Sequence, residues 1–310
     1  MNPGERKQLR KKAEAMHMNV AHNETESSEK TDMQSNAKVR NIPEIFMASI
    51  TWTATIITFA VLAFIVLFIL IKGIPFLRPS LFSLTYNSEN VSLMPALIST
   101  IILTVVSLLI AIPIGIFASI FLVEYAKRGS KAVALVRMTT ETLSGIPSIV
   151  YGLFGLLFFV TFLGWGFSIL AGAFTLGIMI LPLIIRSSEE ALKSVSDTYR
   201  EGSFGLGAGK LRTVFKIVLP SAMPGILAGI ILSIGRIVGE TAALIYTAGT
   251  VAQIPTGLMQ SARTLSVHMY SLSSEGLHTN EGYATAVILL LVVVLINTAS
   301  AKIAKRISRI

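Results

Sequence analysis

The chain has 310 residues, of which 53% are hydrophobic and only 14% are charged, a composition too apolar for an ordinary soluble protein. It contains no cysteine, which excludes disulfides, thiolate metal sites and cysteine nucleophiles. The formal net charge is +9, so nucleic-acid binding has to be tested against the positions of the charges.

Residues 1–49 form a polar segment rich in Lys, Glu, Ser and Asn. The segment lacks the short apolar core of a cleavable signal peptide. We expect it to be a disordered tail.

Six apolar runs follow, each close to the ~20 residues that a helix needs to cross a bilayer. Their approximate ranges are 50–72, 95–123, 144–163, 165–186, 222–249 and 283–303. Internal prolines are tolerable where neighbouring helices satisfy the freed backbone groups. The pattern predicts an all-α integral membrane protein whose six transmembrane helices occupy one domain, residues 50–310.

The positive charges follow a membrane rule. Of the 26 Lys and Arg residues, 22 fall in the tail, in residues 124–143, in residues 186–221 and at the C-terminal end. The opposite side holds Lys72, Arg78 and Arg263. Because cytoplasmic segments carry the excess of Lys and Arg, we expect both termini in the cytoplasm. The charge therefore reflects orientation, and we expect no nucleic-acid partner.

The connection at about residues 187–221 has apolar residues at helical spacing on both sides of a glycine-rich turn. This pattern predicts two short amphipathic helices. A connection of this length is larger than most and favours a binding role. The alternative is a pair of interfacial helices that lie on the lipid.

Within it, the run "GLGAGKL" resembles a phosphate-cradling nucleotide loop but fails its spacing. Phe204 stands where the first glycine should be, and Leu211 stands where the magnesium-binding hydroxyl should be. We therefore expect this chain to bind no cofactor, and any ATP that is used to be hydrolysed by another chain. His268 and His278 have no clustered partners, so we expect no metal site. Glu124 and Glu141 fall at the ends of predicted spans and are interpreted as solvated boundary residues.

Arg236 and Glu240 lie inside the apolar run 222–249. A charged side chain at the bilayer centre costs roughly 2.5–3.5 kcal/mol on insertion scales, so something other than lipid must receive them. A guanidinium gives an oxyanion two charge-assisted hydrogen bonds. On a continuous helix Glu240 shares the face of Arg236 and can hold it when no anion is bound. We expect both residues in a substrate pathway; the alternative is an ion pair that only fastens helices.

A motif in the cytoplasmic connection resembles that of permease subunits of bacterial ABC importers. Their pattern is Glu-Ala-Ala, three residues, Gly, nine residues, then Ile-x-Leu-Pro. The matching positions here are Glu201, Gly202, Ser203, Gly207, Ile217, Leu219 and Pro220, with both alanines replaced by small residues. The resemblance implies a type I ABC importer permease fold, in which these residues couple the chain to an ATP-binding subunit.

Two further stretches, "LSGIPSIVYGLFG" at residues 143–155 and "GRIVGETAALIYTAG" at residues 235–249, resemble the permease subunits of the phosphate-specific (Pst) importer, the A-type more than the C-type. The resemblance covers about residues 90–305. It implies ATP-driven import of inorganic phosphate, with Thr241 joining Arg236 and Glu240 in the pathway. The alternative substrate is another oxyanion, sulfate or molybdate.

The same resemblance implies the partners and the location. The partners are a homologous second permease, two copies of an ATP-binding subunit, an extracytoplasmic phosphate-binding protein and membrane lipid. The location is the bacterial plasma (inner) membrane, and this chain is expected to be a transport subunit rather than an enzyme.

Overall fold

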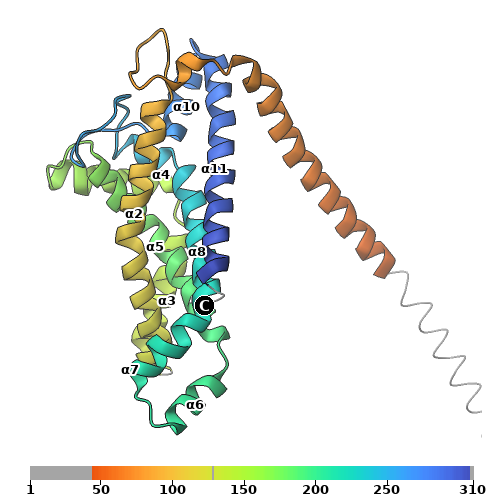
Figure 1. Ribbon diagram of the computed structural model, residues 1–310, viewed down its shortest axis with the longest axis vertical. Coiled ribbons are helices and arrows are strands. Elements are labelled where there is room, and N and C mark those ends of the chain that lie inside the picture. The colour runs from red at the N-terminus through yellow and green to blue at the C-terminus, as the bar shows by residue number, and fades with distance from the viewer. Residues whose placement is uncertain (1–43, 128, 308–310) are drawn as a thin grey trace, which may run out of the picture. The chain divides into compact units, whose positions relative to one another are not determined.

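The computed structural model describes residues 44–127 and 129–307, which contain helices and turns but no strand (Figure 1). The prediction of an all-α protein is confirmed. Most of the predicted tail lies outside the described residues, and residues 44–49 already belong to a helix.

The chain divides into two units, Met1–Leu67 and Phe68–Ile310. Residues 44–67 are the described part of the first unit. They belong to the helix Glu44–Phe76, whose most apolar stretch has a mean hydropathy of 3.0. This helix is long enough to cross a membrane and ends in the 3-10 turn η1 (Ile74–Phe76).

The second unit contains four further helices that are long and apolar enough to span a membrane. They are α2 (Met94–Ile120) with its π-helical end η3 (Phe121–Tyr125), α5 (Ile169–Ser194), the run α7 (Lys210–Thr213), η5 (Val214–Val218) and α8 (Leu219–Val238), and α11 (Thr279–Ile307). Helix α5 packs against both α2 and α8, and α8 packs against α11. The long helices run side by side (Figure 1).

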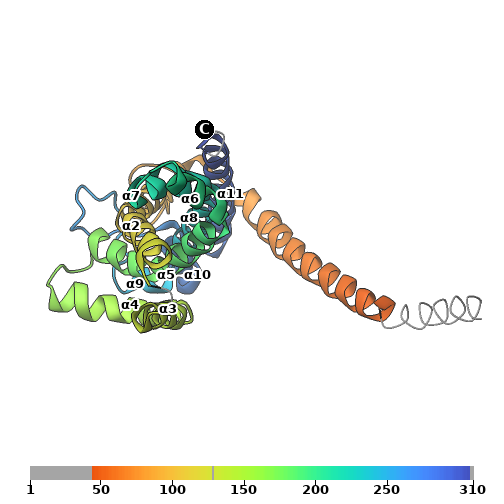
Figure 2. The same ribbon diagram turned by 90° about the horizontal axis from the view of Figure 1, so that it is seen from below.

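The predicted span 144–163 corresponds to α4 (Ser148–Gly155) and its π-helical continuation η4 (Leu156–Phe162). These reach the length of a span only together with the preceding helix α3 (Lys131–Ser144), which meets them at 101° in a bent pair. The bend falls where Pro147 disfavours a helical conformation for the residue before it. Counted with this pair, the described residues provide the six spans expected. Figure 2 shows α3 and α4 together on one side of the bundle.

The connection predicted at residues 187–221 is shorter in the structure, because both neighbouring long helices extend into it. Helix α5 continues to Ser194, and the next long helical run already begins at Lys210. Pro220 cannot donate a backbone hydrogen bond one turn back. The wider π-helical turn of η5 directly precedes it, so the helix continues through the proline.

Short elements lie at the two ends of the bundle. Helix α6 (Asp197–Gly205) lies at the same end as α7, while α10 (Leu265–Glu275) and the 3-10 turn η2 (Pro79–Phe82) belong to the opposite end (Figure 1). Between them, a core of buried side chains on α2, α4 and α5 extends to α9 (Ala242–Ile245), which follows α8. Ile237 and Ala243, on either side of the break between α8 and α9, belong to this core, so the segment with Arg236 and Glu240 packs against it.

Candidate functional site

Arg236 lies in the last turn of α8, and its side chain is half-buried. The neighbouring Ile237 and Val238 are 2% and 1% exposed, which fixes the helix end in the core. Within residues 44–127 and 129–307, the guanidinium forms no hydrogen bond or ion pair. The phenol of Tyr151, on α4, lies within electrostatic range of it.

Glu240 lies beyond the end of α8, so the expectation of a continuous helix through both charges is wrong. The helix ends at Val238, with Gly239 as its C-cap. The Oε1 atom of Glu240 accepts the backbone N–H of Ala243 at 3.1 Å. Its backbone carbonyl accepts the hydroxyl of Ser266 at 2.6 Å. Glu240 therefore ties the break to α9 and α10 instead of holding Arg236.

Thr241 is the N-cap residue of α9, and its side chain makes no capping hydrogen bond. The Thr241 hydroxyl contacts the carbonyl of Gly239 at 3.5 Å, a weak interaction at most. Arg236, Glu240 and Thr241 thus flank one interruption between two helices. Their role in a pathway stays a prediction.

The two stretches that carry the resemblance to the Pst permeases meet in space. Helix α4 crosses α9 at Gly152, where an added Cβ would lie 2.8 Å from the Cα of Ala243. The Tyr151 hydroxyl donates to the carbonyl of Leu143 at 2.8 Å, across the bend between α3 and α4. The glycine is required because the two backbones approach too closely for any side chain. The bend and the break therefore form one packed region beside Arg236.

The chemistry of Arg236 suits an anion. A half-buried guanidinium without a partner in its own chain keeps its charge and its fork of N–H donors free. Such a group gives an oxyanion two parallel charge-assisted hydrogen bonds. The break between α8 and α9 leaves this half-buried donor at a helix end.

The second candidate region is the connection with the importer motif. Ser196 caps α6 by accepting the N–H of Thr198, and α6 then carries Glu201 and Gly202 on its exposed surface. Ser203 is 5% exposed, and its hydroxyl lies 2.8 Å from that of Thr213 on α7. The small residue at position 203 is thus required by packing between the two helices. The prediction of two short helices around a turn is correct for α6 and the turn and wrong for the second helix, since α7 is the start of the long run Lys210–Val238.

The turn and four of the motif residues border a pocket of about 640 Å³. Its lining includes Gly202, Ser203, Gly207 and Ile217. Gly207 has a φ of +80°, a left-handed conformation that favours glycine. Leu219 packs on a neighbouring buried cluster, and Pro220 is exposed in the first turn of α8. Part of the motif therefore shapes one concave surface between α6, the turn and the start of the long run Lys210–Val238.

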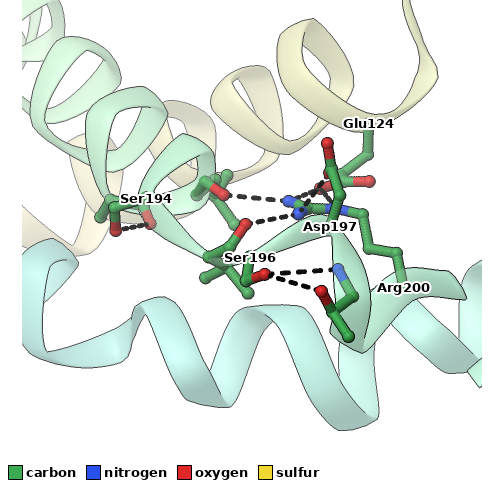
Figure 3. A network of polar contacts seen from close by, with 9 residues as sticks. Glu124, Ser194, Ser196, Asp197 and Arg200 are labelled. Carbon is green, nitrogen blue, oxygen red and sulfur yellow. Dashed lines mark hydrogen bonds and ion pairs between the residues drawn. The ribbon is translucent and has the colours of Figure 1, made fainter. Parts of the chain in front are cut away.

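Sequence reasoning missed the ion pair between Glu124 and Arg200. The Nη2 atom of Arg200 lies 2.7 Å from Oε1 of Glu124, and the Glu124 side chain is 8% exposed (Figure 3). The interpretation of Glu124 as a solvated boundary residue is therefore wrong. The partners are 76 positions apart and carry no periodic signal, so only the fold reveals them.

His268 is also fully buried, and its Nδ1 lies 3.3 Å from Nη1 of Arg263. The Tyr86 ring contacts both residues, edge-on to His268 and 5.5 Å from the Arg263 guanidinium carbon. Across the described part of the chain, no three His, Cys, Asp or Glu residues form a group that could hold a metal ion. That this chain binds no metal or cofactor stays a prediction.

Residues 111–309 match a protein family described as the binding-protein-dependent transport system inner membrane component. The chain is 38% identical over 185 residues to the probable ABC transporter permease protein YqgI of Bacillus subtilis (strain 168), covering 56% of this chain and 63% of that protein. It is 35% identical over 211 residues to the phosphate transport system permease protein PstA 1 of Mycobacterium tuberculosis (strain ATCC 25618 / H37Rv), covering 67% and 68%. The chain thus spans slightly less than two thirds of the first of these relatives.

Solved structures show the same fold at lower identity. A chain of a bacterial alginate ABC transporter superposes with a TM-score of 0.64 at 17% identity, covering 87% of this chain and 97% of that one. A chain of the MetNI methionine ABC transporter, in an inward-facing conformation, gives a TM-score of 0.54 at 21% identity, covering 69% and 93%. At these identities the likeness concerns the fold and not the transported molecule.

Proposed function

Because this chain belongs to the family of binding-protein-dependent transport system inner membrane components, we propose that it is the permease subunit through which an ABC importer moves inorganic phosphate. The fold is that of type I ABC importer permeases, as expected. The importer permease class follows from the family. Phosphate is our inference, supported by relatives named as phosphate transport permeases.

The observation that carries the substrate proposal is the unpaired guanidinium of Arg236. The second ionisation of inorganic phosphate lies near neutral pH, so the ion carries roughly one to two negative charges there. A guanidinium cannot be neutralised by burial at ordinary pH, so it remains a donor for such an anion inside a membrane protein. One such group gives moderate affinity, which suits a pathway that must also release its ion.

ATP hydrolysis belongs to a separate subunit in this class of transporter. We place its docking surface on α6 and on the pocket bordered by the importer motif. Leu206 is 91% exposed and Tyr199 is 60% exposed there, beside the charged Glu201. Apolar side chains this exposed outside a membrane span are typical of a protein-binding surface.

The assembly that this function needs contains a second, homologous permease, two ATP-binding subunits that hold ATP and magnesium, and an extracytoplasmic phosphate-binding protein. The chain is a multi-pass protein of the inner membrane. We propose that both termini and α6 face the cytoplasm, since the Lys and Arg residues concentrate on that side.

Reconstitution tests the function. The chain would be co-purified with its candidate partners, inserted into liposomes and supplied with ATP. We expect ATP-dependent uptake of labelled phosphate that excess sulfate or molybdate does not abolish. Uptake of sulfate or molybdate without uptake of phosphate would overturn the substrate and leave the permease class intact.

A further inference from the structure

Arg200 joins three elements at the end of the bundle that carries α6. Its Nη1 donates to the carbonyl of Val195 at 2.7 Å, and its Nη2 donates to the carbonyl of Leu192 at 3.0 Å. These carbonyls belong to the C-terminal end of α5, which lacks further helical donors. The guanidinium therefore closes α5 from a position on α6 (Figure 3).

The same guanidinium reaches the end of α2. Its Nε and Nη2 both donate to Oε1 of Glu124, at 3.1 and 2.7 Å. Glu124 lies in η3, the π-helical end of α2. The side chains of Arg200 and Glu124 are only 14% and 8% exposed, so solvent screens this ion pair weakly.

A third carboxylate contact is weaker and exposed. Asp197 lies one turn before Arg200 on α6 and accepts from its Nη1 at 3.1 Å, but the Asp197 side chain is 69% exposed. This contact lies within α6 and joins it to no other element. The buried contact with Glu124 and the two carbonyls of α5 are therefore the links that connect Arg200 to the long helices.

We propose that Arg200 and Glu124 are positioning residues that transmit the movement of α6 to α2 and α5, and so couple ATP hydrolysis to transport. The proposal rests on the function above, in which α6 docks on the ATP-binding subunit. Four hydrogen bonds hold the Arg200 guanidinium to Glu124 of η3 and to the end of α5, so it links the movement of α6 to both elements. The other tie of α6 described above, the hydroxyl pair of Ser203 and Thr213, leads to α7 instead.

The test measures phosphate transported per ATP hydrolysed in the reconstituted complex. We expect Arg200→Lys, which keeps the charge but not the fork, to lower this ratio by roughly two- to thirtyfold. Glu124→Gln, which keeps the shape and an acceptor, should lower it less. The double variant should be no worse than Arg200→Lys, because both changes interrupt one link. Asp197→Ala and Glu190→Ala, which remove exposed contacts, are the matched controls and should keep the native ratio.

A second measurement does not depend on the substrate. Spin labels at Lys127→Cys and Gly205→Cys report the distance between the segment after η3 and the end of α6. We expect a narrow distribution in the native background and a broad one with Glu124→Gln or Arg200→Lys. If the native complex transports no phosphate, the proposed substrate is wrong, while these distances still test the link between Arg200 and Glu124. Native ratios and narrow distances in both variants, or a loss of assembled complex with an unchanged ratio, would overturn the proposal.

Discussion

The Oε1 atom of Glu240 accepts a hydrogen bond from the N–H of Ala243 at 3.1 Å, so this carboxylate closes the break between α8 and α9. Arg236 is left without a partner among the described residues. The two charges therefore have separate tasks. Glu240 stabilises the break, and Arg236 remains available to an anion.

The first prediction concerns Glu240. Glu240→Gln keeps an oxygen that can accept the Ala243 N–H, so we expect near-native amounts of complex and phosphate uptake per complex within about threefold of native. Glu240→Ala removes this capping contact, and losses of this kind cost about 0.5–2 kcal/mol. We expect less assembled complex and a lower unfolding temperature for the alanine variant. A large gain in phosphate affinity in the Gln variant would indicate that Glu240 holds Arg236 after all.

The break between α8 and α9 could not be predicted from the sequence. The apolar run 222–249 predicted a helix correctly as far as Val238, because length and hydropathy are local properties. The break after Gly239 is stabilised by Ser266, which donates to the Glu240 carbonyl from α10. A contact of this kind depends on tertiary packing, so an interpretation based on helical spacing paired Arg236 with Glu240 incorrectly.

The importer motif illustrates the opposite case. The apolar spacing and the glycines of the connection that contains this motif predicted a short helix and a turn, which are α6 and the turn at Gly207, because these signals act on the local backbone. The second short helix that the spacing predicted is instead the start of the long helical run Lys210–Val238. The ion pair of Glu124 with Arg200 escaped prediction, since each residue alone has the pattern of a charge at a membrane boundary. Only the approach of α6 to the end of α2 distinguishes it.

The second prediction tests the coupling surface. A Cβ added at Gly202 would have no other atom of this chain within 4 Å, and the φ of Gly202 lies outside the left-handed region that favours glycine. Gly202→Ala should therefore fold normally and stabilise α6 by up to about 1 kcal/mol. Gly202→Trp should also fold, but its bulk on the docking surface should block binding of the ATP-binding subunit. Co-purification of that subunit at native yield with the Trp variant would remove α6 from the interface.

The third prediction concerns orientation. The sequence contains no cysteine, so a single Gly205→Cys variant carries one reactive thiol. Position 205 is exposed at the end of α6. We expect an impermeant thiol reagent to label it in inverted membrane vesicles and not in intact spheroplasts. Labelling of intact spheroplasts would reverse the topology and the side on which ATP acts.

The fourth prediction concerns acid stability at the other end of the bundle. Burial, with the nearby charge of Arg263, lowers the pKa of His268 to about 4 from its ordinary 6.5. The unfolded chain therefore binds a proton that the folded chain does not between those values, so acid favours unfolding there. We expect stability to fall as the pH decreases from about 6.5 towards 4, by at most about 3 kcal/mol. His268→Gln should flatten this part of the profile in thermal unfolding at several pH values, and an unchanged slope would contradict the assignment.

The central claim, that Arg236 contacts phosphate during passage, is tested most directly by uptake of phosphate normalised to assembled complex. Arg236→Ala should lower this uptake by about tenfold or more, because hydrogen bonds to charged groups contribute about 1.5–3 kcal/mol. Arg236→Lys, which keeps the charge without the fork, should fall between the alanine variant and the native chain. Arg186→Ala, which removes an exposed arginine of α5 paired to Glu190, is the matched control and should transport normally. Native uptake per complex by Arg236→Ala would contradict the claim and make Arg236 a structural residue.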